Sequence, residues 1–163
     1  MGSRRGTTGA VTTGPIRNLM PREERVSVDY LDSAERHRTD AEHLFQLGRW
    51  PNADQLYGLA AECGLKAIMQ ALGMLLRPDG APQEAKYRVH VDKLWGEFLT
   101  FANGIGGMAY ASLLPQDCPF QDWSIEQRYH HSAAIPRERV AAHRAATKQV
   151  FDALGNARVD GRL

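Results

Sequence analysis

The chain has 163 residues, of which 43% are hydrophobic, and this length and apolar content are typical of one domain around a single core. Its 20 Lys and Arg residues nearly balance 19 Asp and Glu residues, so a formal net charge of +1 does not by itself indicate a nucleic-acid-binding protein. The sequence has no apolar run of membrane-spanning length, no secretion signal and no paired-cysteine motif, which predicts a cytoplasmic chain with two reduced thiols and no membrane contact.

The first segment, residues 1–27, is rich in Gly, Thr, Arg and Pro and has no apolar period. Such a composition buries too little apolar surface to offset the entropy lost on ordering, so we expect a flexible arm. Residues 1–28 contain five Arg against two Glu, a net charge of +3. The sequence therefore predicts a basic N-terminal arm.

Helical periodicity begins at Tyr30 and predicts two consecutive long helices. Apolar residues spaced by threes and fours indicate a helix over 30–47, with Asp32 or Ser33 near its start and Gly48 at its end. The second helix is predicted to be capped by Asn52 and to end at the turn over 77–80. Its inward stripe is Ala53, Leu56, Tyr57, Ala60, Leu65, Ile68, Leu72 and Leu75 or Leu76.

A third helix is predicted over 88–103 and a short fourth one over 108–114, separated by a glycine-rich break. The inward face of the third helix is Val91, Leu94, Trp95, Phe98, Leu99 and Ala102. Residues 115–135 show no period and predict an irregular segment.

The last helix is predicted to begin at Pro136, where a missing amide costs nothing, and to end at Gly155. Its stripe is Val140, Thr147, Val150, Phe151 and Leu154. Residues 137–163 carry six basic against three acidic residues, whereas residues 29–136 carry a net charge of −5. No segment alternates with the period of a strand, so we expect an all-α bundle of four long helices and one short helix over 28–156, with a tail over 157–163.

The stretch from Ala41 to Met69 resembles the first helical hairpin of HEPN domains, which are helical bundles found in higher eukaryotes and prokaryotes. It reads AEHLFQLGRWPNADQLYGLAAECGLKAIM, with a helix ending at Gly-Arg, an Asn-Ala start to the next helix and a mid-helix Ala-Glu-x-x-Leu-Lys-Ala. His90-Val-Asp-Lys-Leu94-Trp95 fits the third helix of these domains, and Trp123 followed by Arg128-Tyr129 fits a stretch before their last helix. The resemblance covers about residues 30–155 and implies a HEPN-like bundle.

The resemblance implies two classes of function. Many HEPN proteins are metal-independent ribonucleases with an Arg, four to six residues and then a His near the start of the last helix, paired across a dimer. Others bind nucleotides or a partner nucleotidyltransferase without catalysis. For this chain we weigh a metal-independent endoribonuclease against a binding subunit of a larger bacterial complex, of the defence or toxin–antitoxin kind, and favour the second.

Arg137 and His143 match the ribonuclease spacing at the expected place. An imidazole can move a proton and a guanidinium can stabilise phosphate charge, so these residue types suit RNA cleavage. Arg137 and His143 are, however, roughly 120° apart on an ideal helix, and His143 falls within the apolar stripe, which favours a packed histidine. The alternative catalytic set is Arg36, Asp40 and His43, which share a polar face of the first helix and can equally form a solvated face.

Four consecutive residues, Arg128, Tyr129, His130 and His131, form a candidate RNA or nucleotide site together with Arg144. The other interpretation is that Trp123 and Tyr129 fasten the loop while the histidines face solvent. The two histidines have no further ligand at a metal-binding spacing, so we expect no metal and no cofactor. Glu62 and Lys66 are four residues apart and are interpreted as a structural pair, one member of which is half-buried and orients a neighbouring helix. The expected partners are a second copy of the chain, a nucleotidyltransferase, RNA or a nucleotide.

Overall fold

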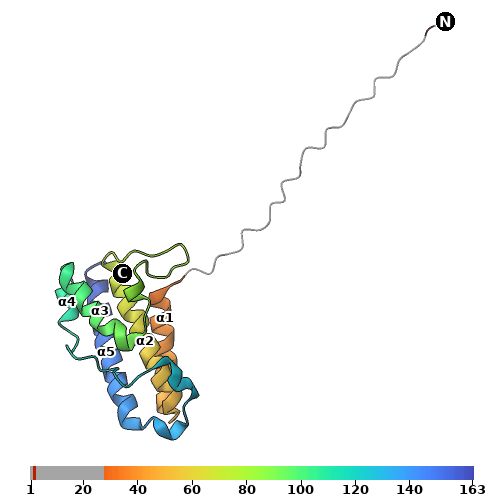
Figure 1. The fold of residues 1–163 in the computed structure, drawn as a ribbon, viewed down its shortest axis with the longest axis vertical. Coiled ribbons are helices and arrows are strands. Elements are labelled where there is room, and N and C mark those ends of the chain that lie inside the picture. The colour runs from red at the N-terminus through yellow and green to blue at the C-terminus, as the bar shows by residue number, and fades with distance from the viewer. Residues whose placement is uncertain (1, 3–27) are drawn as a thin grey trace.

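The computed structural model describes Gly2 and residues 28–163, and these residues form five α-helices and no β-strand (Figure 1). The helices are α1 (Tyr30–Gln46), α2 (Trp50–Ala71), α3 (Val91–Gly104), α4 (Met108–Ala111) and α5 (Arg137–Val159). The prediction of an all-α bundle with four long helices and one short helix is therefore confirmed. The predicted flexible arm lies outside the described residues, apart from Gly2.

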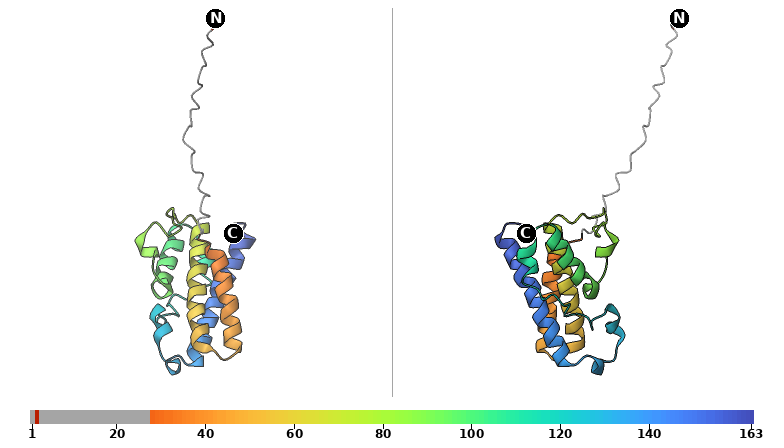
Figure 2. Two further views of the ribbon diagram at one scale, coloured as in Figure 1. Left: turned by 90° about the vertical axis from the view of Figure 1, so that its right-hand side faces the viewer. Right: turned by 60° about the vertical axis from the view of Figure 1, so that its left-hand side comes forward.

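Helix α2 forms the centre of the bundle, and α1, α3 and α5 each pack against it (Figure 2). Small residues on α2 allow this close approach from several sides. A Cβ atom on Gly64, for example, would lie 2.7 Å from Val150 Cγ1 of α5. Because α2 is surrounded, its buried side chains include the polar Asp54, Glu62 and Lys66, which lie where partners from other elements can reach them.

The inward faces of the helices follow the predicted periodicity. All six residues predicted to point inward from α3 are buried. On α5, Val140, Thr147, Val150 and Leu154 are buried and Phe151 is partly buried. His143 is buried within the same stripe, as its position predicts.

The four long helices end in the same backbone arrangement. A glycine with positive φ follows each cap residue, and amides beyond the cap donate back to carbonyls of the last turn, which satisfies groups that would otherwise lack partners. These glycines are Gly48, Gly73, Gly106 and Gly161. The prediction for Gly48 is confirmed, but two predicted ends are wrong: α2 ends at Ala71 rather than near residue 77, and α5 continues through Gly155 to Val159.

The predicted helix starts also need correction. Asp29, rather than Asp32 or Ser33, caps α1 by accepting from the amide of Asp32 at 2.9 Å. Helix α2 begins at Trp50, so Asn52 lies inside its first turn, because the chain leaves α1 directly through Arg49. Helix α3 begins at Val91 after a short 3₁₀ turn, and Pro136 is the residue before α5 rather than its first residue.

The segment between α4 and α5 contains two short 3₁₀ helices, η2 (Ile125–Tyr129) and η3 (Ser132–Ala134). It runs along the bundle and is fastened by Trp123, whose indole Nε1 donates to the carbonyl of Asp54 at 3.0 Å. Trp123 thus fastens the loop, whereas Tyr129 is 76% exposed and does not. Within residues 28–163, no helix has the length and apolar character that crossing a membrane requires.

Candidate functional site

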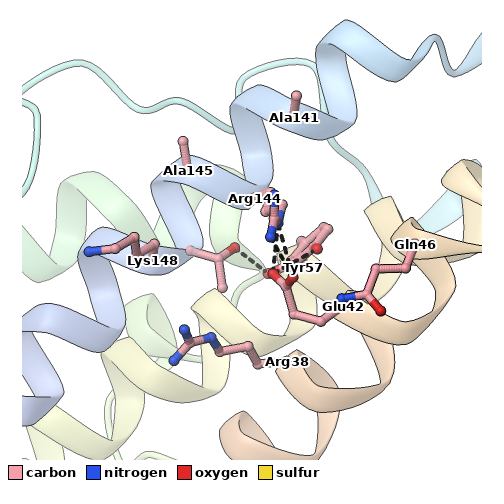
Figure 3. A pocket seen from close by; sticks show the side chains of 9 residues that line it. Arg38, Glu42, Gln46, Tyr57, Ala141, Arg144, Ala145 and Lys148 are labelled. Atoms are coloured by element: carbon pink, nitrogen blue, oxygen red, sulfur yellow. Dashed lines mark hydrogen bonds and ion pairs between the residues drawn. The ribbon is translucent and has the colours of Figure 1, made fainter.

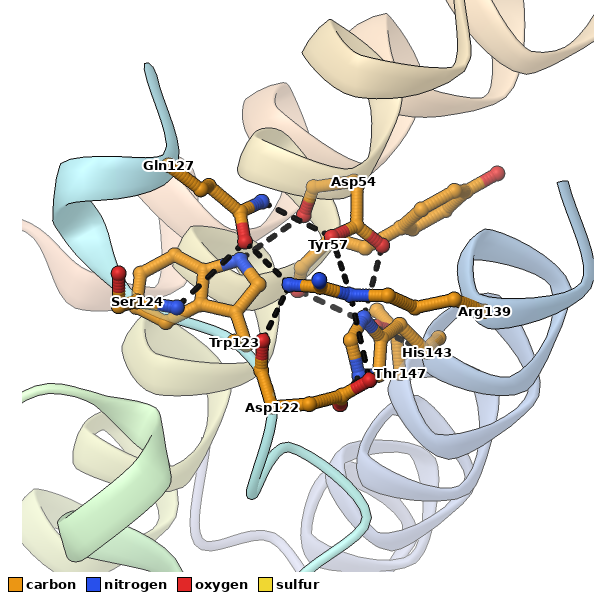
Figure 4. A network of polar contacts seen from close by, with 9 residues as sticks. All are labelled: Asp54, Tyr57, Asp122, Trp123, Ser124, Gln127, Arg139, His143 and Thr147. Atoms are coloured by element: carbon orange, nitrogen blue, oxygen red, sulfur yellow. Dashed lines mark hydrogen bonds and ion pairs between the residues drawn. The ribbon is translucent and has the colours of Figure 1, made fainter. Parts of the chain in front are cut away.

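His143 lies in a buried polar cluster between α2, α5 and the loop before η2 (Figure 4). Its Nδ1 is 2.7 Å from Asp54 Oδ1 and its Nε2 is 3.0 Å from Asp122 Oδ1. The ring is 1% exposed and stacks on Phe120, with centroids 4.7 Å apart. Both nitrogens are therefore engaged and no face of the ring is open to a substrate.

Two further side chains complete this His143 cluster, which we define as Asp54, Asp122, Gln127, Arg139 and His143. Arg139 lies 3.3 Å from Asp122 Oδ2 and 3.7 Å from Asp54 Oδ2, and it donates to Gln127 Oε1 at 2.7 Å. Gln127 Nε2 in turn donates to Asp54 Oδ2 at 2.8 Å. Two carboxylates, the buried one of Asp54 and the largely exposed one of Asp122, thus face one imidazole and one guanidinium. The cluster ties the loop to α2 and α5.

Arg137 does not join His143 within the chain. Its side chain is exposed, and its guanidinium lies 5.9 Å from the centroid of Phe45, on α1. Arg144 lies 4.9 Å from the same ring. The structure therefore brings Arg137 together with Arg144 across Phe45, and their proposed roles in catalysis and RNA binding stay predictions.

The alternative catalytic residues on α1 are all exposed. Arg36 pairs with Asp32 at 3.8 Å, one turn before it, rather than with Asp40. His43 lines a surface hollow of about 510 Å³ with Arg38 and Arg158. Arg36, Asp40 and His43 thus lie on the surface, and Arg36 and Asp40 do not line that hollow.

A groove of about 620 Å³ runs between α1 and α5 over the buried ring of Tyr57 of α2 (Figure 3). We call it the α1–α5 groove; its charged lining residues are Arg38, Glu42, Arg144 and Lys148. It is continuous with the hollow beside His43, which shares Arg38 and Glu42. The groove exists because α1 and α5 each pack on α2 and leave a space between them.

Among the described residues, Glu42 is the single acidic side chain in the lining of this groove, and it is held by two neighbours. It accepts three hydrogen bonds from Arg144, at 2.7, 2.9 and 3.0 Å, and a fourth from the Tyr57 hydroxyl at 2.9 Å. The Arg144 hydrogen bonds, with that of Tyr57, lower the pKa of Glu42, and burial raises the pKa of Tyr57. Glu42 therefore stays ionised and Tyr57 stays neutral near pH 7.

The other two cations of the groove, Arg38 and Lys148, form no ion pair with Glu42. Arg38 has no ion-pair partner among residues 28–163, and its guanidinium lies 4.4 Å from the centroid of Phe151, which holds it in place. Lys148 pairs with the exposed Asp152 at 2.7 Å. Figure 3 shows the charged ends of Arg38 and Lys148 extending to the same side, from α1 and α5. An anion in the groove would meet cations from both walls.

The loop residues predicted to contact RNA divide into three environments. Arg128 and His130 line a second pocket of about 420 Å³ at the start of α2. Tyr129 is exposed, and the Arg128 guanidinium lies 4.7 Å from the centroid of its ring. His131 Nδ1 accepts from the amide of Ala133 at 3.2 Å and so caps η3. Arg144 lies apart from these residues, in the α1–α5 groove.

Glu62 links two residues from the stretches that resemble the HEPN family. It accepts from Lys66 Nζ at 2.7 Å, and its other carboxylate oxygen is 2.9 Å from His90 Nδ1 at the start of α3. Glu62 and Lys66 are both buried, whereas the sequence predicts half-burial of one of them, and Glu62 contacts the residue that precedes α3. Burial also raises the pKa of the neighbouring Cys63 thiol to about 11, which keeps it protonated near pH 7.

The part of the chain that the structure describes contains no group of three His, Cys, Asp or Glu side chains arranged to hold a metal ion. His130 and His131 are both exposed. The expectation of no metal and no cofactor stays a prediction.

Several residues of these sites escape sequence reasoning. Arg139 is the exception, because it precedes His143 by one helical turn and the sequence therefore places the two on one face of a helix. Asp54 and Asp122 are 89 and 21 residues away from His143, and no local pattern indicates that they converge on it. Arg38, Glu42 and Lys148 resemble ordinary surface charges until α1 and α5 are placed side by side.

Comparison of the chain with protein-family models, curated proteins and solved structures finds no match.

Proposed function

We propose that this chain is a HEPN-like, RNA- or nucleotide-associated binding subunit that holds a phosphate-bearing ligand in the α1–α5 groove. The resemblance of residues 41–69 to the HEPN hairpin supports the family, and it implies assembly as a homodimer or with a nucleotidyltransferase in a bacterial defence or toxin–antitoxin complex. The chemistry of the groove supports the ligand class.

The observation that carries the proposal is the pair of Arg38 and Lys148 on opposite walls of one groove. A guanidinium that is stacked on an aromatic ring and lacks a carboxylate partner among the described residues can give parallel hydrogen bonds to a phosphate with little loss of side-chain freedom. Arg144 lies on α5 one turn before Lys148, and its guanidinium already donates to both carboxylate oxygens of Glu42. An anionic ligand would therefore find three cations in the groove, of which Arg144 is paired with Glu42 and Lys148 with Asp152.

The environment of His143 argues against its acting as a catalytic base. A general base needs a nitrogen within reach of the proton that it removes, whereas both nitrogens of His143 are already occupied by carboxylates. Arg137, the cation that would accompany it, lies beside Phe45 instead. We therefore favour binding over ribonuclease activity, and RNA cleavage in the following test would contradict this choice.

The test is binding of a fluorescently labelled single-stranded RNA of 12 nucleotides to the full chain, measured by anisotropy in EDTA over a series of salt concentrations. Replacing both Arg38 and Lys148 by Ala should weaken binding about tenfold or more, since each charged hydrogen bond contributes about 1.5 kcal/mol or more. The slope of log affinity against log salt should fall by about 0.7 for each phosphate group that the variant no longer binds.

The matched control is Arg77→Ala, which removes an exposed cation that pairs with Asp79 beyond the end of α2. Every variant keeps the basic residues 1–28, so their contribution is equal throughout. Equal affinity of the groove variant and the control would contradict the proposal. Shortened RNA in EDTA, seen on a denaturing gel, would replace it with the ribonuclease function.

A further inference from the structure

A second pocket, which we call the Gln55 pocket, lies between the first turns of α2 and the η2–η3 loop. Its volume is about 420 Å³, and its polar lining residues are Asn52, Gln55, Gln127, Arg128, His130 and Ser132. It is lined by residues different from those of the α1–α5 groove. The pocket therefore brings the predicted RNA-contacting residues Arg128 and His130 next to side-chain amides of α2.

Neither polar atom of the Gln55 side-chain amide has a hydrogen-bond partner among the described residues. Both its Nε2 and its Oε1 are buried and lack a partner. In Gln127, which lines the same pocket, both amide atoms are hydrogen-bonded: Nε2 donates to Asp54 and Oε1 accepts from Arg139. Unpaired polar atoms are rare in protein interiors because they lose their bonds to water on burial. Gln55 thus presents an unused donor and an unused acceptor side by side.

A cation of the pocket lining, Arg128, contacts the aromatic ring of the next residue, Tyr129. Tyr129 is 76% exposed, and the Arg128 guanidinium lies 4.7 Å from the centroid of its ring. Stacking on an exposed aromatic ring is how proteins hold unpaired bases, and an adjacent Arg can hold the phosphate. The Arg128–Tyr129 pair therefore offers two of the three contacts that a nucleotide requires.

We infer that the Gln55 pocket binds one unpaired nucleobase, with the base edge on the Gln55 amide, the base face on Tyr129 and the phosphate on Arg128. An amide bonds base edges that carry an adjacent donor and acceptor, as adenine does. Because the amide atoms are buried, side chains of the pocket lining must shift to admit the base, and Arg128 and His130 are exposed members of that lining. The inference rests on the proposed association with RNA or nucleotides, but not on the α1–α5 groove.

The experiment follows the side-chain NH₂ signal of Gln55 in ¹⁵N-labelled full chain by NMR, assigned by its loss in Gln55→Leu. Adding AMP or UMP should shift this signal, whereas ribose 5-phosphate, which has a phosphate and no base, should not. Gln55→Leu and Tyr129→Leu should each weaken nucleotide binding about tenfold or more, since a base contact of this kind contributes about 1.4 kcal/mol or more.

Gln55→Leu should also unfold at the same temperature as the parent chain or higher, because it removes two unsatisfied polar atoms without changing the volume greatly. This result separates loss of binding from loss of fold. The matched control is Gln70→Leu, on an exposed position of the same helix, which should bind nucleotides as the parent does.

Three results would overturn the inference: no shift of the Gln55 signal with either nucleotide, an equal shift with ribose 5-phosphate, or parental binding by Gln55→Leu. The groove variant lacking Arg38 and Lys148 should still show the nucleotide-induced shift. If that variant binds RNA normally while Gln55→Leu loses nucleotide binding, the groove proposal fails and the pocket stands.

Discussion

The contact between Gly58 and Trp123 decides how closely the loop before α5 approaches α2. A Cβ atom on Gly58 would lie 2.1 Å from Cε2 of the indole ring, which is far inside contact distance. The indole is buried and bonded to the carbonyl of Asp54, so it cannot turn aside alone. Replacing Gly58 with any larger residue therefore pushes away the segment that carries Asp122 and Gln127.

Gly58→Ala should lower the free energy of unfolding by about 1–3 kcal/mol, the usual cost of overfilling a packed core. The measurement is urea denaturation followed by tryptophan fluorescence. Gly96→Ala is the control, because Gly96 is exposed on α3 with open space around it and Ala favours a helix. Parental stability of Gly58→Ala would show that the loop adjusts at no cost.

At the scale of the helix, one glycine inside α5 and one just beyond its end have opposite effects on stability. Gly155 lies inside the helix, exposed, with no atom near the place of a Cβ. Gly161 follows the helix with φ of +68°, a conformation that residues with a side chain rarely adopt, and its amide and that of Arg162 close the last turn. The end of α5 is therefore determined by Gly161.

Gly155→Ala should raise the free energy of unfolding by about 0.5–1 kcal/mol, since Ala loses less backbone entropy in a helix than Gly does. Gly161→Ala should lower it by about 1 kcal/mol, because Ala is strained at positive φ. Thermal unfolding followed by circular dichroism compares the two variants. The same sign of change for both would contradict this account of the helix end.

At the scale of the whole molecule, ion pairs join the two outer helices across the groove. Arg144 of α5 binds Glu42 of α1, and Arg158 of α5 contacts Glu35 of α1. These pairs link helices that otherwise meet mainly through α2. One of these two links between α1 and α5 therefore depends on the charge of Glu42.

The pKa of Glu42 is lower in the folded chain than in the unfolded one, so this carboxylate stabilises the fold at pH values above its unfolded pKa. That contribution should be lost as the pH falls through the folded pKa. Because Glu42 and Arg144 are partly exposed, we expect a contribution of about 0.5–1 kcal/mol at pH 7. Urea unfolding at pH 7 and at pH 3 measures it, with Glu42→Gln as the comparison.

Glu42→Gln should be less stable than the parent at pH 7, and this difference should shrink towards pH 3 as the parent's carboxyl takes up a proton. Asp152→Asn is the control, since Asp152 pairs with Lys148 on the exposed surface of α5. An equal difference between parent and Glu42→Gln at both pH values would mean that the charge of Glu42 does not stabilise the bundle.

The sequence by itself determined the helical class, the number of helices and most of their inward residues. These features depend on spacings of three and four residues, which are local and repeat along the chain; the six buried residues of α3 are the clearest case. Helix ends were less predictable, because a glycine ends a helix only where the backbone turns left-handed. Gly155 and Gly161 look alike in the sequence and differ only in the folded chain.

Only the tertiary structure decided which polar residues meet. His143 was predicted to lie in an apolar stripe, but Asp54 and Asp122 reach it from elements distant in sequence, and their contacts close off both of its nitrogens. In the same way, Arg38 and Lys148 share a groove only because α1 and α5 both pack on α2. Contacts of this kind depend on how whole helices are placed, and the periodicity of a single helix carries no information about its neighbour's register.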